Sequence, residues 1–237
     1  MWGCFFQAIQ YFSRIDILST LSGLLACLAG LPDAINTSQE PIILGSPENT
    51  TIQPGEPILL RLLKVNIQLW QDLPYFSMNL RDSMNGPEVY LCRGEPAATA
   101  ERKWTNINTF LAILVRDHGT AFPDLFGIRV QYAFWALSSA LEHPPKTRLG
   151  KNMAVHLPAA CRWISIAGDA VWEALDTGFE EKPWTAAPGR LWQSQVGTNQ
   201  VDGRRWAFWK TRLESLRDDS QLDPELGDVA LQASRLM

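Results

Sequence analysis

The amino-acid sequence predicts an all-α protein, a compact single-domain array of about six to eight helices joined by loops rich in proline and glycine. In the second half of the chain, apolar residues recur at intervals of three and four, the period of one helix face. No segment shows the sustained apolar–polar alternation that is typical of a strand, and no repeat recurs at a fixed period. With 237 residues, of which 46% are hydrophobic and 19% charged, the chain can bury a sizeable core.

Residues 1–57 are expected to hold an apolar helix and then a linker rich in proline and glycine, loosely packed on the rest. Residues 17–31 form an uncharged apolar run that ends at Pro32. The run is shorter than the roughly 20 residues that a membrane span needs, and Arg14 is the only cation before it. We therefore expect a buried or fraying N-terminal helix, with a signal or an anchor at residues 17–31 as the alternative.

A helical domain is predicted over residues 58–217, followed by an acidic tail at residues 218–237. Apolar spacing predicts one helix over 58–69 and four more regular helices after it. Stretches rich in proline and glycine, at 81–103 and 182–203, are expected to be loops. The four regular helices are expected to begin near Trp104, Val130, Leu157 and Arg204.

The last predicted helix carries a cassette rich in tryptophan at residues 205–213. Its large apolar residues are spaced by three, four and three positions, so they share one helix face, and cations surround them. We expect this face to pack into the core while the cations stay in solvent. The alternatives are a partner-binding face, since Trp and Arg are frequent in interface hot spots, and a basic helix on a membrane or nucleic acid. The residues concerned are Trp206, Trp209, Leu213 and Leu216, with Arg204, Arg205, Lys210, Arg212 and Arg217.

Composition and motifs exclude several classes of function. The formal net charge of −4 argues against general binding to nucleic acid. The three histidines are scattered, and no GxSxG, P-loop or Rossmann pattern lies in a suitable setting, so we predict neither a metal nor another cofactor. The cysteines at 4, 27, 92 and 161 form no CxxC pair, so we expect free, mostly buried thiols and a cytoplasmic location. Two glycosylation sequons, at Asn36 and Asn49, are short enough to arise by chance.

Three segments occur together in a fixed order: residues 104–112 (WTNINTFLA), 157–164 (LPAACRWI) and 205–213 (RWAFWKTRL), with 135–142 between the first two. Together they resemble a fungal family catalogued as domain of unknown function 3632. The likeness covers roughly residues 58–217 and implies a filamentous-fungal source and a helical domain. It implies no established activity, cofactor or catalytic residue. This chain has Ser138-Ser139 where the family pattern would place an arginine.

Five residues are candidates for binding a ligand or partner, and no catalytic residue is predicted. The two amides among them flank Ile107 in a predicted helix, where we favour structural hydrogen bonding over contact with a ligand. The others are large aromatic anchors. The candidates are Asn106, Asn108, Trp163, Trp206 and Trp209.

Two functions from different classes fit these features. The first is a non-catalytic helical adaptor or accessory protein of a filamentous fungus, which would bind an unknown protein partner. The alternative is a small-molecule-binding protein or enzyme of fungal specialised metabolism, with an apolar Trp-lined pocket for a small apolar ligand. Neither a nucleic acid nor a membrane is expected as a partner.

Overall fold

The computed structural model describes residues 2–44, 50–62, 65–176, 187–195, 200–220 and 222–237. Over these residues the predicted all-α class is confirmed, with ten α-helices and two small antiparallel hairpins. Short 3-10 helices at Gly127–Val130 and Gly150–Asn152 precede α6 and α7. In chain order the elements are α1 (Trp2–Tyr11), α2 (Ile15–Ala29), β1 (Ile42–Leu44), β2 (Thr50–Ile52), β3 (Leu59–Leu62), β4 (Val65–Gln68), α3 (Phe76–Ser83), α4 (Glu88–Cys92), α5 (Ala97–His118), α6 (Gln131–Leu141), α7 (Met153–Asp176), α8 (Arg190–Gln195), α9 (Gly203–Leu216) and α10 (Pro224–Ser234).

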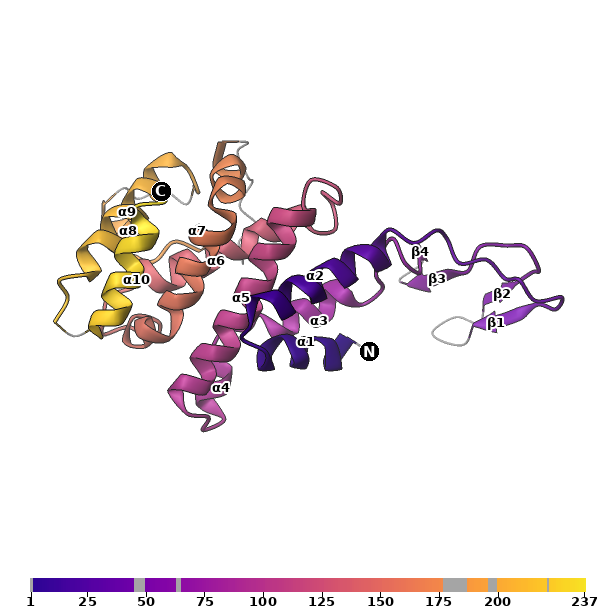
Figure 1. The fold of residues 1–237 in the computed structure, drawn as a ribbon, viewed down its shortest axis with the longest axis horizontal. Helices are drawn as coiled ribbons and strands as arrows, with labels where there is room; N and C mark the ends of the chain where they lie inside the picture. The colour runs from indigo at the N-terminus through magenta and orange to yellow at the C-terminus, as the bar shows by residue number, and fades with distance from the viewer. Residues whose placement is uncertain (1, 45–49, 63–64, 177–186, 196–199, 221) are drawn as a thin grey trace.

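Helix α5 is the centre of the helical body. Every residue from Asn106 to Val115 is buried, as expected of a helix that is covered on all sides. It packs against α7, α1 and α2, while α6 packs on α7 and α10 packs on both α7 and α9 (Figure 1). The helices from both ends of the chain therefore share one core.

The N-terminal helices are part of that core. In α1, the buried residues Trp2, Phe6 and Ile9 are spaced by four and three, and the Phe6 ring stacks on Phe76 of α3 with centroids 5.6 Å apart. Helix α2 contains most of the predicted apolar run, up to Ala29, and buries Leu18. No described helix is long and apolar enough to cross a membrane.

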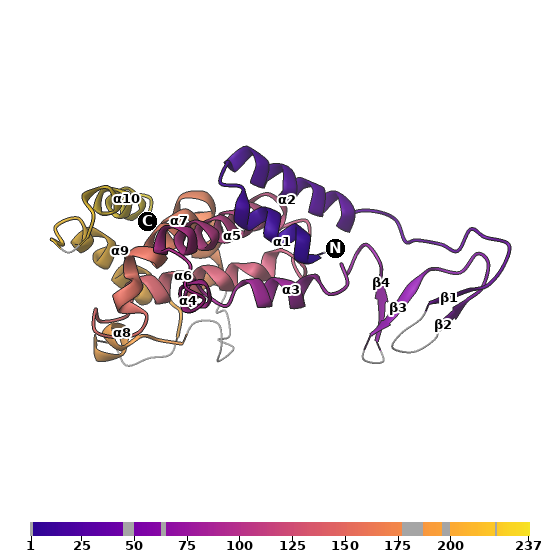
Figure 2. The same cartoon turned by 90° about the horizontal axis from the view of Figure 1, so that it is seen from below.

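Residues 33–69, apart from 45–49 and 63–64, form an arm that extends away from the helical body (Figures 1 and 2). The arm contains two separate hairpins. In one, Ile42 of β1 pairs with Ile52 of β2. In the other, Leu59 of β3 pairs with Gln68 of β4. The chain runs outward from α2 to β1 and β2 and returns through β3 and β4, so both ends of the arm meet the helices at its base (Figure 2).

The helix predicted over residues 58–69 is wrong, because residues 59–62 and 65–68 form strands β3 and β4. Its apolar residues fit a helical period, but a short apolar run fits a strand equally well. The β-branched Val65 and Ile67 alternate with the polar Asn66 and Gln68, which favours the strand. The expected linker before it likewise contains strands β1 and β2.

The helix count also exceeds the expected six to eight, because stretches expected as loops contain short helices. Helix α4 and the start of α5 lie within residues 81–103, and α8 lies within 182–203. Helix α5 begins directly after Pro96, so this proline marks the start of a helix and does not make all of residues 81–103 a loop. The expected acidic tail contains α10, which Asp223 caps by accepting a hydrogen bond from the Glu225 N–H.

Candidate functional site

The outer part of the arm is held together by its own hydrogen bonds. The buried Asn36 donates from Nδ2 to the carbonyl oxygens of Glu40 (3.1 Å) and Ile52 (3.0 Å), and its Oδ1 accepts from Ser38 N (3.0 Å). The Gly55 N–H donates to the Asn36 carbonyl over 2.8 Å. Because Nδ2 is the atom that would carry a glycan, the sequon at Asn36 is occupied by structural bonds; Asn49 lies outside the described residues.

The arm presents strand edges and apolar side chains to solvent. Each hairpin has two strands, so every described strand has one edge without a neighbouring strand. Ile43 in β1 is 66% exposed and Ile35 is 51% exposed. Exposed edges of this kind can accept an extended segment of another chain.

An apolar pocket of about 290 Å³ lies at the base of the arm, between β3, α2 and the turn before α3. All its lining residues are aliphatic or aromatic, and none carries a charge. Trp2 fixes one wall, since its Nε1 donates to the Pro74 carbonyl over 2.6 Å. The pocket is lined by Trp2, Leu28, Leu60, Leu69, Trp70, Leu73, Pro74 and Tyr75.

The backbone beside the apolar pocket is strained. Leu73 (φ 43°) and Tyr75 (φ 64°) occupy the left-handed region, which side chains with a Cβ rarely adopt. They are the only non-glycine residues with positive φ in the described part of the chain. Both line the pocket, and such strain is most frequent where a ligand or partner binds.

A buried ion pair joins α6 to the cassette helix α9. The fully buried Glu142 carboxylate accepts from Arg205 Nε (2.7 Å) and Nη2 (3.0 Å), from Trp209 Nε1 (2.6 Å) and from the Gly189 N–H (2.7 Å). Ser138 Oγ donates to the same carboxylate over 3.1 Å. The expectation that all cassette cations stay in solvent is therefore wrong for Arg205, because a buried carboxylate needs a cationic partner.

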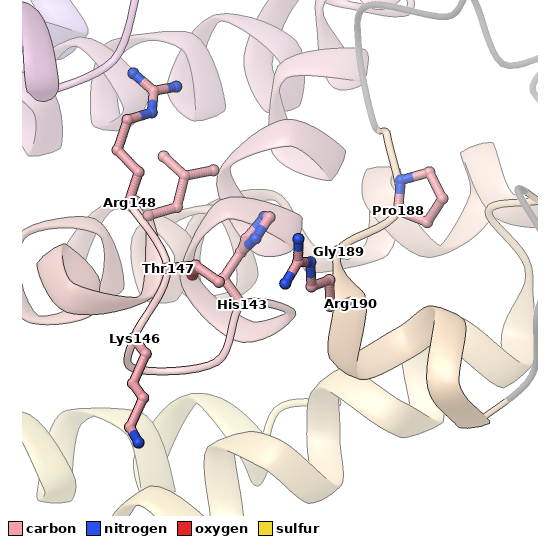
Figure 3. Close-up of a pocket in the computed structure, with 8 residues that line it drawn as sticks. His143, Lys146, Thr147, Arg148, Pro188, Gly189 and Arg190 are labelled. Carbon is pink, nitrogen blue, oxygen red and sulfur yellow. The ribbon is translucent and has the colours of Figure 1, made fainter.

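A basic hollow of about 500 Å³ opens next to this ion pair, between the loop after α6 and the start of α8. Four of its eight lining residues are basic and none is acidic. Figure 3 shows His143 and Arg190 close together, while Lys146 and Arg148 extend in opposite directions from the loop. The hollow is lined by His143, Lys146, Thr147, Arg148, Leu149, Pro188, Gly189 and Arg190.

A second buried pair connects α4 to α7. His156 Nε2 and Glu88 Oε1 are 2.8 Å apart, and Asn152 Nδ2 donates to the same oxygen over 3.4 Å. Burial raises the pKa of Glu88, whereas its hydrogen bond and charge interaction with His156 lower it. The lowering effects together outweigh burial, so the pKa of Glu88 lies below its ordinary value. Burial is also the main reason why the pKa of His143, at the edge of the basic hollow, is lowered.

The predicted site residues fall into three places. Asn108 Nδ2 donates to the Trp104 carbonyl, and its Oδ1 accepts from Trp163 Nε1, each over 2.8 Å. Asn106 Nδ2 donates to the carbonyl of Gln10 over 3.0 Å, and Gln10 lies 96 positions earlier in the chain, in α1.

The two remaining candidates, Trp206 and Trp209, are neighbours with ring centroids 6.5 Å apart. None of the five predicted site residues lines the apolar pocket or the basic hollow. The amides of Asn106 and Asn108 and the indoles of Trp163 and Trp209 make structural hydrogen bonds, and a role for the five residues in binding stays a prediction.

Sequence reasoning missed both concavities. The only sequence signal for the basic hollow was the short segment Lys146-Thr147-Arg148 after two prolines, and Arg190 is more than 40 residues away. Three of the four cysteines are exposed, so the expectation of mostly buried thiols is also wrong; Cys161 alone is buried. Among the residues that the structure describes, no cluster of His, Cys, Asp or Glu could hold a metal ion.

Comparison with known protein families gives a match over much of the chain. The family model described as "Protein of unknown function (DUF3632)" matches residues 57–213. No curated protein and no solved structure matches the chain. The match covers most of the helical body and begins inside the arm, so β1, β2 and the N-terminal helices lie outside it.

Proposed function

The chain belongs to the DUF3632 family, and we propose that it is a non-catalytic helical adaptor or accessory protein of a filamentous fungus, with the arm as its binding element. The observation that carries the proposal is the extension of the arm from the body with free strand edges (Figure 2). Its partner would be a protein that adds an extended segment to β1 or β2. A cytoplasmic location belongs to the same proposal.

The chemistry of the arm supports a protein partner over a small molecule. An extended segment would pair its backbone with the free edge and place alternate side chains against exposed residues such as Ile43 and Ile35. The internal hydrogen bonds of Asn36 hold the arm in shape before it binds, which reduces the entropy lost on association.

The experiment removes the outer arm and keeps the body. Residues 38–53 are replaced by two glycines, because the Asn36 carbonyl and the Gly55 N–H are only 2.8 Å apart and can be joined by a short turn. Tagged parent and variant are purified from the native fungus and compared by mass spectrometry. The same partner should be abundant with the parent and absent with the variant, whose melting temperature should match the parent's.

A photo-crosslinking residue at Ile43 tests whether the partner touches the arm directly. The matched control places the same residue at Leu24, which is 51% exposed on α2. We expect the partner to be captured from position 43 and not from position 24. Equal recovery with the shortened variant, or capture from position 24 alone, would refute the adaptor proposal.

The apolar pocket supports a second candidate, a protein that binds a small apolar ligand. Its two tryptophans, its uncharged lining and the adjacent strained residues Leu73 and Tyr75 are the supporting observations. The neutral dye N-phenyl-1-naphthylamine is a suitable fluorescent probe. Leu28→Trp should fill the pocket and abolish dye binding, whereas Leu24→Trp, on the exposed face of the same helix, should leave it unchanged. Equal dye binding by the two variants would exclude the apolar pocket as the binding site of the dye.

A further inference from the structure

We propose that the basic hollow binds a small molecule that carries a phosphate group. This site lies on the helical body, between the loop after α6 and the start of α8, and so is independent of the arm and of the function proposed above. The proposal depends on the unbalanced charge of the hollow, on the fixed backbone of its walls and on its size.

The cations of the hollow have no partners among the described residues. Lys146, Arg148 and Arg190 are exposed and make no ion pair there. Among the residues that the structure describes, no carboxylate lines the hollow, so none balances these charges there. A bound anion would supply the missing negative charge.

The two nearest buried carboxylates are already used by other groups. Glu142 is paired with Arg205 and also accepts from the Gly189 N–H, so its charge is balanced inside the core. Glu88 is held by His156. Neither carboxylate therefore neutralises the cations of the hollow, and the positive charge faces solvent.

The backbone that forms the walls is fixed by close contacts. At Gly189, an added Cβ would clash with the Glu142 carbonyl, and at Gly150 one would clash with the Pro144 carbonyl. The Leu191 N–H donates to the Glu142 carbonyl over 2.9 Å, which ties the start of α8 to the end of α6. Thr147 Oγ1 donates to the Pro144 carbonyl over 2.7 Å. These contacts preserve the concave shape before a ligand enters.

A phosphate group fits this arrangement better than a carboxylate does. It carries up to two charges and several acceptor oxygens, which guanidinium groups bind in pairs and a lysine ammonium binds as a point charge. A volume of about 500 Å³ exceeds that of a bare phosphate and leaves room for an organic substituent. A nucleic acid would need a basic stripe beyond the hollow, and the net charge of −4 disfavours one.

Isothermal titration calorimetry with inorganic pyrophosphate in magnesium-free buffer tests the site. The protein should bind one pyrophosphate per chain and inorganic phosphate more weakly. Arg190→Gln and Lys146→Gln should each weaken pyrophosphate binding by about fivefold, the effect of one partly exposed ion pair. Arg162→Gln removes one exposed positive charge from α7, outside the hollow, and should leave binding unchanged.

Three results would overturn the proposal. The first is that the parent protein does not bind pyrophosphate. The second is equal weakening by Arg162→Gln and Arg190→Gln, which would indicate a general effect of charge. The third is competition by a single-stranded oligonucleotide at lower concentration than pyrophosphate, which would indicate a surface for extended polyanions. Circular dichroism of each variant confirms that the fold is intact.

Discussion

Glu142 illustrates how single side chains stabilise this fold. Its carboxylate is fully buried and accepts hydrogen bonds from α6, α9 and the backbone before α8. Its charge is tolerated because Arg205 Nε lies 2.7 Å away and is equally buried. Removing one partner leaves the other charge buried and unpaired, which costs much stability. Replacing both residues with apolar ones would cost far less.

Arg205→Met should lower the free energy of unfolding by about 3–5 kcal/mol, because it leaves the Glu142 carboxylate buried without a cation. Lys210→Met on the same helix is the control and should change stability by about 0.5 kcal/mol or less, since Lys210 makes no ion pair among the described residues. Urea unfolding monitored by tryptophan fluorescence measures both. The double variant with Glu142→Gln should recover part of the loss; a further decrease would contradict the pairing.

Cysteine labelling checks the environment of the thiols. Burial raises the pKa of Cys161 to about 12, so at pH 8 its thiol stays protonated and unreactive. Cys4, Cys27 and Cys92 are exposed. Iodoacetamide should modify these three in the folded protein and all four in denaturant, as counted by intact mass. Rapid modification of Cys161 without denaturant would show that α7 is not packed as described.

At the scale of elements, the cassette helix α9 is the clearest case of a pattern that determines packing. Trp206, Trp209, Leu213 and Leu216 are all buried, as the spacing predicted. Asp202 caps the helix by accepting from the Arg204 and Arg205 N–H groups. Because the indoles face inward, the helix contributes to the core, and its solvent-facing side carries the remaining cations.

Trp206→Ala should destabilise the protein by about 3–5 kcal/mol, the cost of a large cavity in a packed core. Trp172, whose ring centroid lies 5.8 Å from that of Trp206, is 49% exposed and provides the control. Trp172→Ala should cost about 1 kcal/mol, since less apolar area is lost. Thermal unfolding distinguishes the two. If Trp206→Ala melted with the parent, the cassette face would be an interface rather than core.

The elements also show how far a local pattern reaches. The four regular helices could be predicted because their apolar stripes are long, and α2 because its apolar run is uncharged. The β3–β4 hairpin could not, since a short apolar run fits both periods and only pairing with another strand decides between them. The short helices α4 and α8 have too few turns for a period to be visible.

At the scale of the whole molecule, acid should unfold the protein through its paired carboxylates. The pKa values of Glu88, Asp117 and Asp202 are lowered in the folded state. Lowered values stabilise the folded state above the ordinary pKa of each group, and this stability is lost as the pH falls through the folded-state pKa. The melting temperature should therefore fall steeply below about pH 4.5.

Glu88→Gln tests the contribution of Glu88, whose side chain is buried. This variant should have a lower melting temperature than the parent at pH 7. The difference in melting temperature should decrease as the pH approaches 3, because the parent then loses the charge that the variant lacks. Asp16→Asn is the control, because the pKa of Asp16 is also lowered, first by its hydrogen bond with Arg14. Its carboxylate lies in solvent, however, where an ion pair contributes little to stability. A constant gap for Glu88→Gln across this range would contradict its contribution to the pH dependence. Differential scanning calorimetry supplies both curves.

The sequence alone determined the helical class, the main amphipathic helices, the inward face of the cassette and the family, because each depends on local spacing or on the order of segments. The tertiary structure decided the rest. It made Arg205 a buried partner of Glu142, 63 positions away. It placed Arg190 beside His143 and turned the described residues between 33 and 69 into an arm. These features arise from contacts between distant segments, and neither periodicity nor composition encodes which segments meet.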